Sequence, residues 1–111
     1  MVGVIPGEVI MHAQPSGRGY VRLRETPDHP WPDGSVSSPA EINGHEFHYS
    51  SLEALDGEPR YAYEVVRGTG IDGGHDGYIY RNLLACYSHQ RNTGSNAWAK
   101  RFVEHVRRCR R

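Results

Sequence analysis

The sequence predicts a small, β-rich α/β fold with a single helix, which lies at the C-terminal end. Glycine and proline, 13 and 7 of the 111 residues, divide most of the chain into short extended segments. One later stretch has the four-residue spacing of an amphipathic helix. The length suits one domain, residues 1–111. Because one helix cannot cover both faces of a mixed sheet, we expect the chain to be part of a larger α/β layer structure.

The N-terminal third is expected to form a hairpin followed by a loop. Residues 9–12 are a short apolar run, residues 19–23 alternate in polarity, and a turn at 14–17 separates these two expected strands. Residues 26–39 contain four prolines and have no period, which predicts a surface loop.

The middle of the chain has two further expected strands, at 45–50 and 61–67, joined by a turn or a single helical turn at 52–59. A glycine-rich connection at 68–77 leads into extended segments at 78–80 and 83–87. It lacks the Gly-Lys-Ser/Thr ending of a phosphate-binding loop and the spacing of a calcium loop. We therefore expect a tight turn there.

The one predicted helix begins near Ser95 or Asn96, either of which can cap it. Trp98, Phe102 and Val106 recur every four residues and make an apolar stripe that we expect to be buried. The segment 100–111 carries six basic residues against one acid, although the formal net charge of the whole chain is zero. Cations suit the negative end of a helix dipole, so a solvated helix end is favoured over a nucleic-acid site.

The sequence contains no apolar stretch of membrane-spanning length, and residues 1–7 do not have the pattern of a signal peptide. We therefore expect a cytoplasmic protein with no membrane and no nucleic-acid partner. Cys86 and Cys109 form no Cys-x-x-Cys pair and neither lies in a nucleophile elbow, which disfavours a disulfide, a zinc site or a complete hydrolase.

Polar side chains are concentrated on the expected strand at 45–50. Because side chains alternate across a strand, Glu46, His48 and Ser50 share one face, and His45 lies on the other. A carboxylate and an imidazole on one face suit general acid/base work or metal ligation, and they equally suit a polar, hydrogen-bonded strand face. The spacing leaves these three interpretations open.

His89 is a second candidate, because it follows an apolar run by two residues. In an open α/β sheet, ligands bind beyond the carboxyl ends of the strands, where such a residue lies.

Four stretches together resemble the C-terminal half of the glutamine amidotransferase domain of cobyrinic acid a,c-diamide synthases and their sirohaem-amidating relatives. The likeness extends over nearly the whole chain. The matching stretches are Met1-Val2-Gly3-Val4-Ile5-Pro6-Gly7 with Val9-Ile10-Met11, Gly17-Arg18-Gly19-Tyr20-Val21, Gly44-His45-Glu46-Phe47-His48-Tyr49-Ser50, and Asn82-Leu83-Leu84-Ala85 with Tyr87-Ser88-His89 and the helix from Ser95-Asn96 through Arg101-Phe102-Val103.

The resemblance implies a flavodoxin-like, class I amidotransferase architecture and a set of site roles. In such enzymes a cysteine attacks the side-chain amide of glutamine, a histidine acts as its base, and the released ammonia amidates a tetrapyrrole carboxylate. His89 matches the catalytic histidine of the family. Glu46, with His48 beside it, is the candidate that orients it. Arg91 stands two residues beyond His89, where many triad amidotransferases have a glutamate, so the third member of the triad is left open.

The resemblance also implies that the nucleophile-bearing half lies upstream, and that the ATP and magnesium of the reaction bind to a domain further upstream. We therefore expect this chain to bind no cofactor and to be inactive alone, as a split subunit, a truncated product or a repurposed domain. Its partners are then glutamine and a tetrapyrrole carboxylate through a complementary chain, with homo- or hetero-oligomers expected from an uncovered sheet.

Two alternatives remain. One is a non-catalytic module that binds an anionic tetrapyrrole or a protein through Arg18, His45 and aromatic residues. The other is a metal-binding fold that uses Glu46, His48 and His89.

Overall fold

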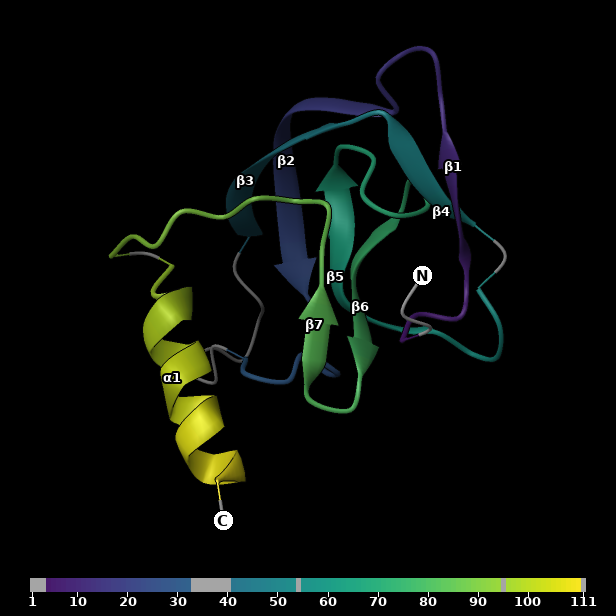
Figure 1. Ribbon diagram of the computed structural model, residues 1–111. Coiled ribbons are helices and arrows are strands. Elements are labelled where there is room, and N and C mark those ends of the chain that lie inside the picture. Colours follow the sequence, from purple (N-terminus) through teal and green to yellow (C-terminus); the bar gives the residue numbers. More distant parts are fainter. Residues whose placement is uncertain (1–3, 33–40, 54, 95, 111) are drawn as a thin grey trace.

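The computed structural model describes residues 4–32, 41–53, 55–94 and 96–110. Residues 1–3, at the start of the expected family match, lie outside these ranges. So do residues 33–39 of the expected loop and the capping candidate Ser95. The described residues form seven strands and one helix (Figure 1). These are β1 (Glu8–Met11), β2 (Gly17–Glu25), β3 (Glu41–His48), β4 (Ser50–Glu53), β5 (Arg60–Arg67), β6 (His75–Tyr80), β7 (Leu83–Ala85) and α1 (Trp98–Cys109).

The strands form two antiparallel sheets. The larger has the order β3-β2-β5-β6-β7, and the smaller pairs β1 with β4. After β7 the chain returns to the free edge of β3, where the backbones of His45 and His89 form an isolated bridge. The segment that follows β7 therefore connects the two edges of the larger sheet (Figure 1).

The core lies on the inward face of the larger sheet. Val21 and Leu23 alternate with exposed arginines along β2, as expected for a strand with one buried face. They pack with Ile42, Ala62, Tyr63 and Ile79, against which Val65 and Leu84 are also placed.

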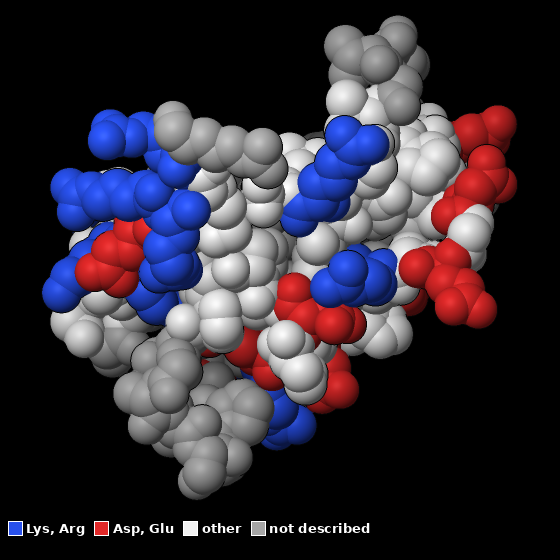
Figure 2. Space-filling view, turned by 90° about the horizontal axis from the view of Figure 1, so that it is seen from below, with Lys and Arg blue, Asp and Glu red and all other residues white. Residues whose placement is uncertain are grey.

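Helix α1 packs on one side of this core through a small contact (Figure 1). The rings of Trp31 and Phe102 lie 5.0 Å apart, and Arg101 forms a 3.0 Å ion pair with Glu25 at the end of β2. Phe102 is nevertheless 41% exposed and Val106 49% exposed, so the predicted burial of the helical stripe is only partly right. Figure 2 shows Lys and Arg side chains gathered at the side where α1 lies and acidic side chains gathered at the opposite side.

The predicted set of short strands with one C-terminal helix is confirmed, with several corrections. The hairpin expected between residues 9–12 and 19–23 does not form, because β1 pairs with β4 while β2 pairs with β3 and β5. The turn expected at 52–59 is shorter, because β4 extends to Glu53, and the connection expected at 68–77 is shorter, because β6 begins at His75.

The strand expected at 45–50 ends at His48, and β4 begins a separate pairing with β1. The extended segment expected at 83–87 forms a strand only as far as Ala85, where β7 ends. The helix begins at Trp98 with Ala97 as its N-cap, so Asn96 is not the cap. The side-chain oxygen of Asn96 instead accepts a hydrogen bond from Arg101.

Every strand pair in the described ranges is antiparallel. These strands therefore do not themselves form the parallel sheet of a flavodoxin-like layer. Of the helices in the described part of the chain, none is long and apolar enough to cross a membrane.

Candidate functional site

Glu46 and His48 lie side by side on the inward face of β3, as their spacing predicts. The side chains are only 2% and 8% exposed, and Nε2 of His48 lies 3.0 Å from Oε2 of Glu46. A Cβ atom on Gly17 of the neighbouring strand would lie 2.3 Å from His48 Nε2, so the absence of a side chain there makes room for the pair. The sequence therefore correctly predicts that the two groups meet.

The carboxylate of Glu46 fastens the glycine-rich connection to β3. It accepts hydrogen bonds from the backbone N–H groups of Thr69 (2.7 Å) and Gly70 (3.0 Å), besides its contact with His48. Burial alone raises the pKa of Glu46, but the hydrogen bonds from Gly70, His48 and Thr69 together outweigh it and lower the pKa below its ordinary value. Glu46 is therefore a buried carboxylate held in its charged form.

His48 has hydrogen-bond acceptors at both ring nitrogens. Its Nδ1 lies 2.8 Å from the carbonyl oxygen of Ser50, and its Nε2 faces Glu46. An imidazole can donate to both acceptors only when it is protonated. The ring of Tyr87 stacks on it at 4.0 Å, and the Tyr87 hydroxyl lies 3.0 Å from Ser50 Oγ. This arrangement suits a buried, hydrogen-bonded structural pair better than a proton-transfer group open to a substrate.

His89 lies apart from this pair, on the exposed side of the sheet. Its N–H donates to the carbonyl of His45 (2.7 Å), and the N–H of His45 donates back to the carbonyl of His89 (3.0 Å). The two exposed rings lie 6.3 Å apart. A Cβ on Gly44 would lie 2.9 Å from the His89 carbonyl oxygen, so glycine permits this close approach.

The imidazole of His89 is open to a reaction partner. Within the described part of the chain, neither of its ring nitrogens has a hydrogen-bond partner, while both its backbone groups are bonded. A fixed backbone with an open ring suits a general base for a group that approaches from outside.

The structure brings Glu46 together with His48 but joins neither to His89. The oxygens of Glu46 are occupied by Thr69, Gly70 and His48. The ring of His89 instead neighbours that of His45, whose side chain alternates with Glu46 along β3. The described residues also contain no group of three or more His, Cys, Asp or Glu side chains arranged to hold a metal ion. Glu46, His48 and His89 therefore do not form the common site that the metal alternative requires.

The residues of the tetrapyrrole-binding alternative do share one face. Arg18 pairs with Phe47 across β2 and β3, and Tyr20 pairs with His45, so their side chains point the same way. All four are exposed, Tyr20 by 79%. We call this surface the outer aromatic face; it consists of Arg18, Tyr20, His45 and Phe47. His89 lies at its border, beside His45.

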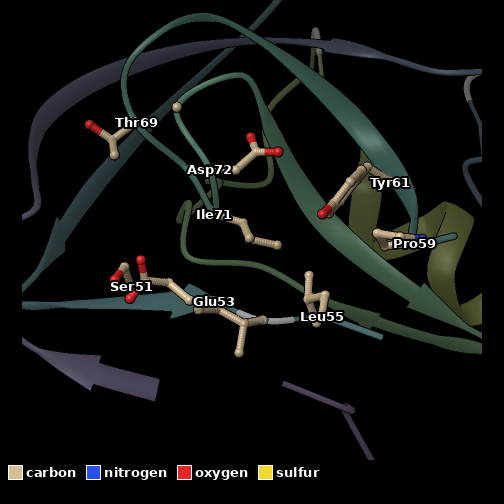
Figure 3. A pocket seen from close by; sticks show the side chains of 10 residues that line it. Ser51, Glu53, Leu55, Pro59, Tyr61, Thr69, Ile71 and Asp72 are labelled. Carbon is tan, nitrogen blue, oxygen red and sulfur yellow. The ribbon is translucent and has the colours of Figure 1, made fainter. Parts of the chain in front are cut away.

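An open cavity of about 650 Å³ lies elsewhere, between β4, the start of β5 and the 68–74 connection. Figure 3 shows that Tyr61 of β5 faces it from one side and that Ile71 and Asp72 face it from the 68–74 connection. The predicted site residues do not line it, although Thr69, on its wall, donates its N–H to Glu46.

Sequence reasoning missed one residue close to the predicted site. Asp76, at the start of β6, is fully buried and accepts hydrogen bonds from the N–H groups of Tyr87 and Ser88. The glycine-rich segment around Asp76 carries no local signal of this role, because its partners are more than ten residues away in the sequence.

Comparison with known proteins gives the family. The profile of the CobB/CobQ-like glutamine amidotransferase domain matches residues 1–97. The cobyrinate a,c-diamide synthase of Magnetococcus marinus is 42% identical over 99 residues, which cover 89% of this chain and 20% of that protein. The enzyme of the same name from Archaeoglobus fulgidus is 36% identical over 104 residues, which cover 94% of this chain and 22% of that protein. No solved structure matches the chain significantly.

The chain thus spans about a fifth of the length of the curated relatives it matches. The profile match extends from the N-terminal end of the chain to the start of α1, and so includes β3 and His89. On this evidence the chain belongs to the CobB/CobQ-like glutamine amidotransferase domain family.

Proposed function

We propose that this chain is the histidine-bearing part of a glutamine amidotransferase that supplies ammonia for ATP-dependent amidation of tetrapyrrole carboxylates, such as those of cobyrinic acid or sirohaem. The observation that carries the proposal is the state of His89: an exposed ring without hydrogen bonds, on a backbone fixed to β3. Family membership and the names of the relatives support the reaction and the substrate class.

In this reaction His89 moves protons for a thiol that another part of the enzyme supplies. The neutral imidazole takes the thiol proton, and the thiolate attacks the side-chain amide carbon of glutamine. When the carbon–nitrogen bond breaks, the imidazolium returns the proton to the departing nitrogen, which leaves as ammonia. Water then releases glutamate from the thiol, with the same imidazole as base.

The thiol-bearing part, in this proposal, supplies the parallel, flavodoxin-like portion of the domain. ATP and Mg²⁺ act on the tetrapyrrole carboxylate at a separate synthetase domain. The 68–74 connection of this chain turns directly into strand β6 rather than into a helix N-terminus, which is the element that cradles phosphate in P-loops. Glu46 and His48 support the fold of β3 and take no part in the proton transfer.

Mixing the purified chain with a polypeptide that carries the cysteine-bearing half of this family tests the proposal. Glutamine-dependent ammonia release should appear only in the mixture, and His89→Ala should lower it by about a thousandfold, because a nucleophile without its base keeps little activity. The backbone bridge to His45 remains in that variant, so circular dichroism should be unchanged. His12→Ala, at another exposed histidine, is the matched control and should keep wild-type activity. Equal ammonia release by the His89→Ala and wild-type mixtures would refute the role.

The outer aromatic face supports a second candidate function, the binding of an anionic tetrapyrrole without catalysis. An arginine beside exposed aromatic rings suits a planar macrocycle that bears carboxylates. Titration of sirohaem into the chain, followed by absorbance, should then show saturable binding that Arg18→Ala weakens and Arg60→Ala, at an exposed arginine on β5, does not. Binding with no change in Arg18→Ala would exclude this face.

A further inference from the structure

Asp76 is a carboxylate enclosed in the core with no cation beside it. It is 0% exposed, and in the described part of the chain no basic side chain forms an ion pair with it. Its two oxygens accept the backbone N–H groups of two consecutive residues, Oδ1 that of Tyr87 at 3.0 Å and Oδ2 that of Ser88 at 2.8 Å. Burial of a carboxylate is costly unless hydrogen bonds offset it, so these two bonds define what Asp76 does in the fold.

The two residues that Asp76 holds immediately precede His89. Strand β7 ends at Ala85, so the chain leaves the regular sheet just before this point. Asp76 fixes residues 87 and 88, and the bridge to His45 fixes residue 89. Three successive backbone positions are thus held from two sides, by β6 and by β3.

We propose that Asp76 is the positioning residue that sets the place of the His89 imidazole through the main chain of Tyr87 and Ser88. This inference rests on the proposed function, in which His89 is the base. Asp76 touches no substrate. It limits the movement of the segment so that the ring stays where an incoming thiol can meet it, and a displacement of about 1 Å can cost about a hundredfold in rate.

Asp76→Asn tests the inference with a nearly isosteric change. An amide has one acceptor oxygen and one NH₂ donor, so it can satisfy only one of the two N–H groups and turns a donor toward the other. Asp72→Asn is the matched control. Asp72 also accepts two backbone N–H groups, those of Gly74 and His75, but it is exposed and contacts neither Tyr87 nor Ser88.

Amide hydrogen exchange measured by NMR on the full chain gives the first result. In Asp76→Asn, the amides of Tyr87 and Ser88 should exchange about tenfold faster or more, while core amides of β2 keep their protection. In Asp72→Asn, the exchange of Tyr87 and Ser88 should match that of the wild type. Unchanged exchange of both amides in a folded Asp76→Asn chain would overturn the inference.

Kinetics of the reconstituted mixture give the second result. Asp76→Asn should lower kcat for ammonia release about ten- to a hundredfold and leave the KM for glutamine unchanged, because a displaced base slows the chemistry without altering glutamine contacts. A wild-type kcat together with faster exchange would overturn the positioning role. If even the wild-type mixture releases no ammonia, the proposed function fails, and NMR order parameters of the His89 ring in Asp76→Asn then decide the inference: a ring as rigid as in the wild type overturns it.

If Asp76→Asn does not fold, amide exchange in the wild-type chain can still test the inference. Tyr87 and Ser88 should then be protected about tenfold or more over the exposed residues Arg91 and Asn92, which lie a few positions further along. Exchange of all four amides at one rate would show that the buried carboxylate does not hold the segment.

Discussion

His29 is a buried histidine held in its neutral form by its neighbours. Its Nδ1 accepts the N–H of Trp31 (3.1 Å), and its Nε2 lies 2.9 Å from the Tyr63 hydroxyl, so the proton belongs on Nε2. Burial lowers the pKa of His29 to about 4, with further lowering from the charges of Arg101 and His105, although Glu25 lies 3.7 Å away. A second proton on the ring would face the N–H of Trp31.

The free energy of unfolding should therefore depend on pH through His29. Because its pKa is depressed in the folded state, the unfolded chain binds the proton first, and stability is lost as the pH falls from about 6.5 to about 4. The loss amounts to about 3 kcal/mol. His29→Asn, whose side-chain oxygen can still accept from Trp31, should be less stable at pH 7 but lose less over this range. Urea unfolding at pH 7, 5.5 and 4.5 measures both slopes, and equal slopes would contradict the assignment.

Glu46 gives a second prediction, because its carboxylate joins β3 to the glycine-rich connection. Glu46→Gln cannot accept from both Thr69 and Gly70 and should lower the free energy of unfolding by about 2–3 kcal/mol at pH 7. The pKa of Glu46 is depressed in the folded state, so the wild type loses this advantage as the pH falls below the ordinary value of 4.5. The difference between the two proteins should shrink accordingly.

Urea unfolding at pH 7 and pH 3 measures that difference. The control is Glu41→Gln on the same strand, whose exposed ion pairs should contribute within about 0.5 kcal/mol. A difference between Glu46→Gln and the wild type that grows in acid would show that Glu46 is not ionised in the folded protein.

At the level of single residues, the sequence predicts contacts only between near neighbours in the chain. Alternation along one strand was enough to place Glu46 beside His48, since both lie on β3. The separation of His89 from Glu46 depends on how the chain returns to β3 after β7, and no local pattern encodes that return. Asp76 was missed for the same reason.

Helix α1 is attached to the sheet mainly through the side chain of Arg101. This guanidinium pairs with Glu25 at 3.0 Å and donates to the carbonyl of Trp31 at 3.1 Å, and it is only 17% exposed. Several apolar residues of the helix remain exposed, so this polar contact has few others to support it.

Arg101→Met should consequently destabilise the protein by about 3 kcal/mol, because it removes the Arg101 guanidinium from its ion pair with the mostly buried Glu25 carboxylate. Arg60→Met is the matched control. Its partner Asp28 and Arg60 itself are both more than half exposed, so a loss within about 0.5 kcal/mol is expected. Chemical denaturation followed by tryptophan fluorescence measures both. Equal stability of the two variants would mean that α1 contributes little to the fold.

Strand positions could be predicted from sequence because each strand carries its own polarity pattern between glycines and prolines. Strand partners could not. The separation of β4 from β3 arises from pairing with β1, some forty residues earlier in the chain, and the antiparallel order of the larger sheet is likewise set by distant contacts.

The molecule as a whole leaves apolar surface uncovered on two elements. The outer aromatic face exposes Tyr20 by 79% and Phe47 by 51%, and α1 exposes Val103 by 46%. Surface of this kind commonly marks a contact with another protein. It agrees with a chain that spans about a fifth of its relatives.

We expect the purified chain to associate at micromolar concentration through the outer aromatic face. Tyr20→Lys combined with Phe47→Lys should lower the mass measured by light scattering toward that of a monomer, with little change in Tm, because both side chains are exposed. Tyr80→Lys, at an exposed aromatic residue on β6, is the control and should associate as the wild type does. A wild-type chain that is monomeric at this concentration would contradict the prediction.

The paired N–H and carbonyl groups that join residue 89 to residue 45 belong to the main chain, and almost any amino acid can supply them. Evolutionary change of the imidazole would thus leave the scaffold unaltered. If His89 is the base we propose, a homologue with another side chain at this position would keep its shape but lose its catalytic base, and its sequence alone would show the loss.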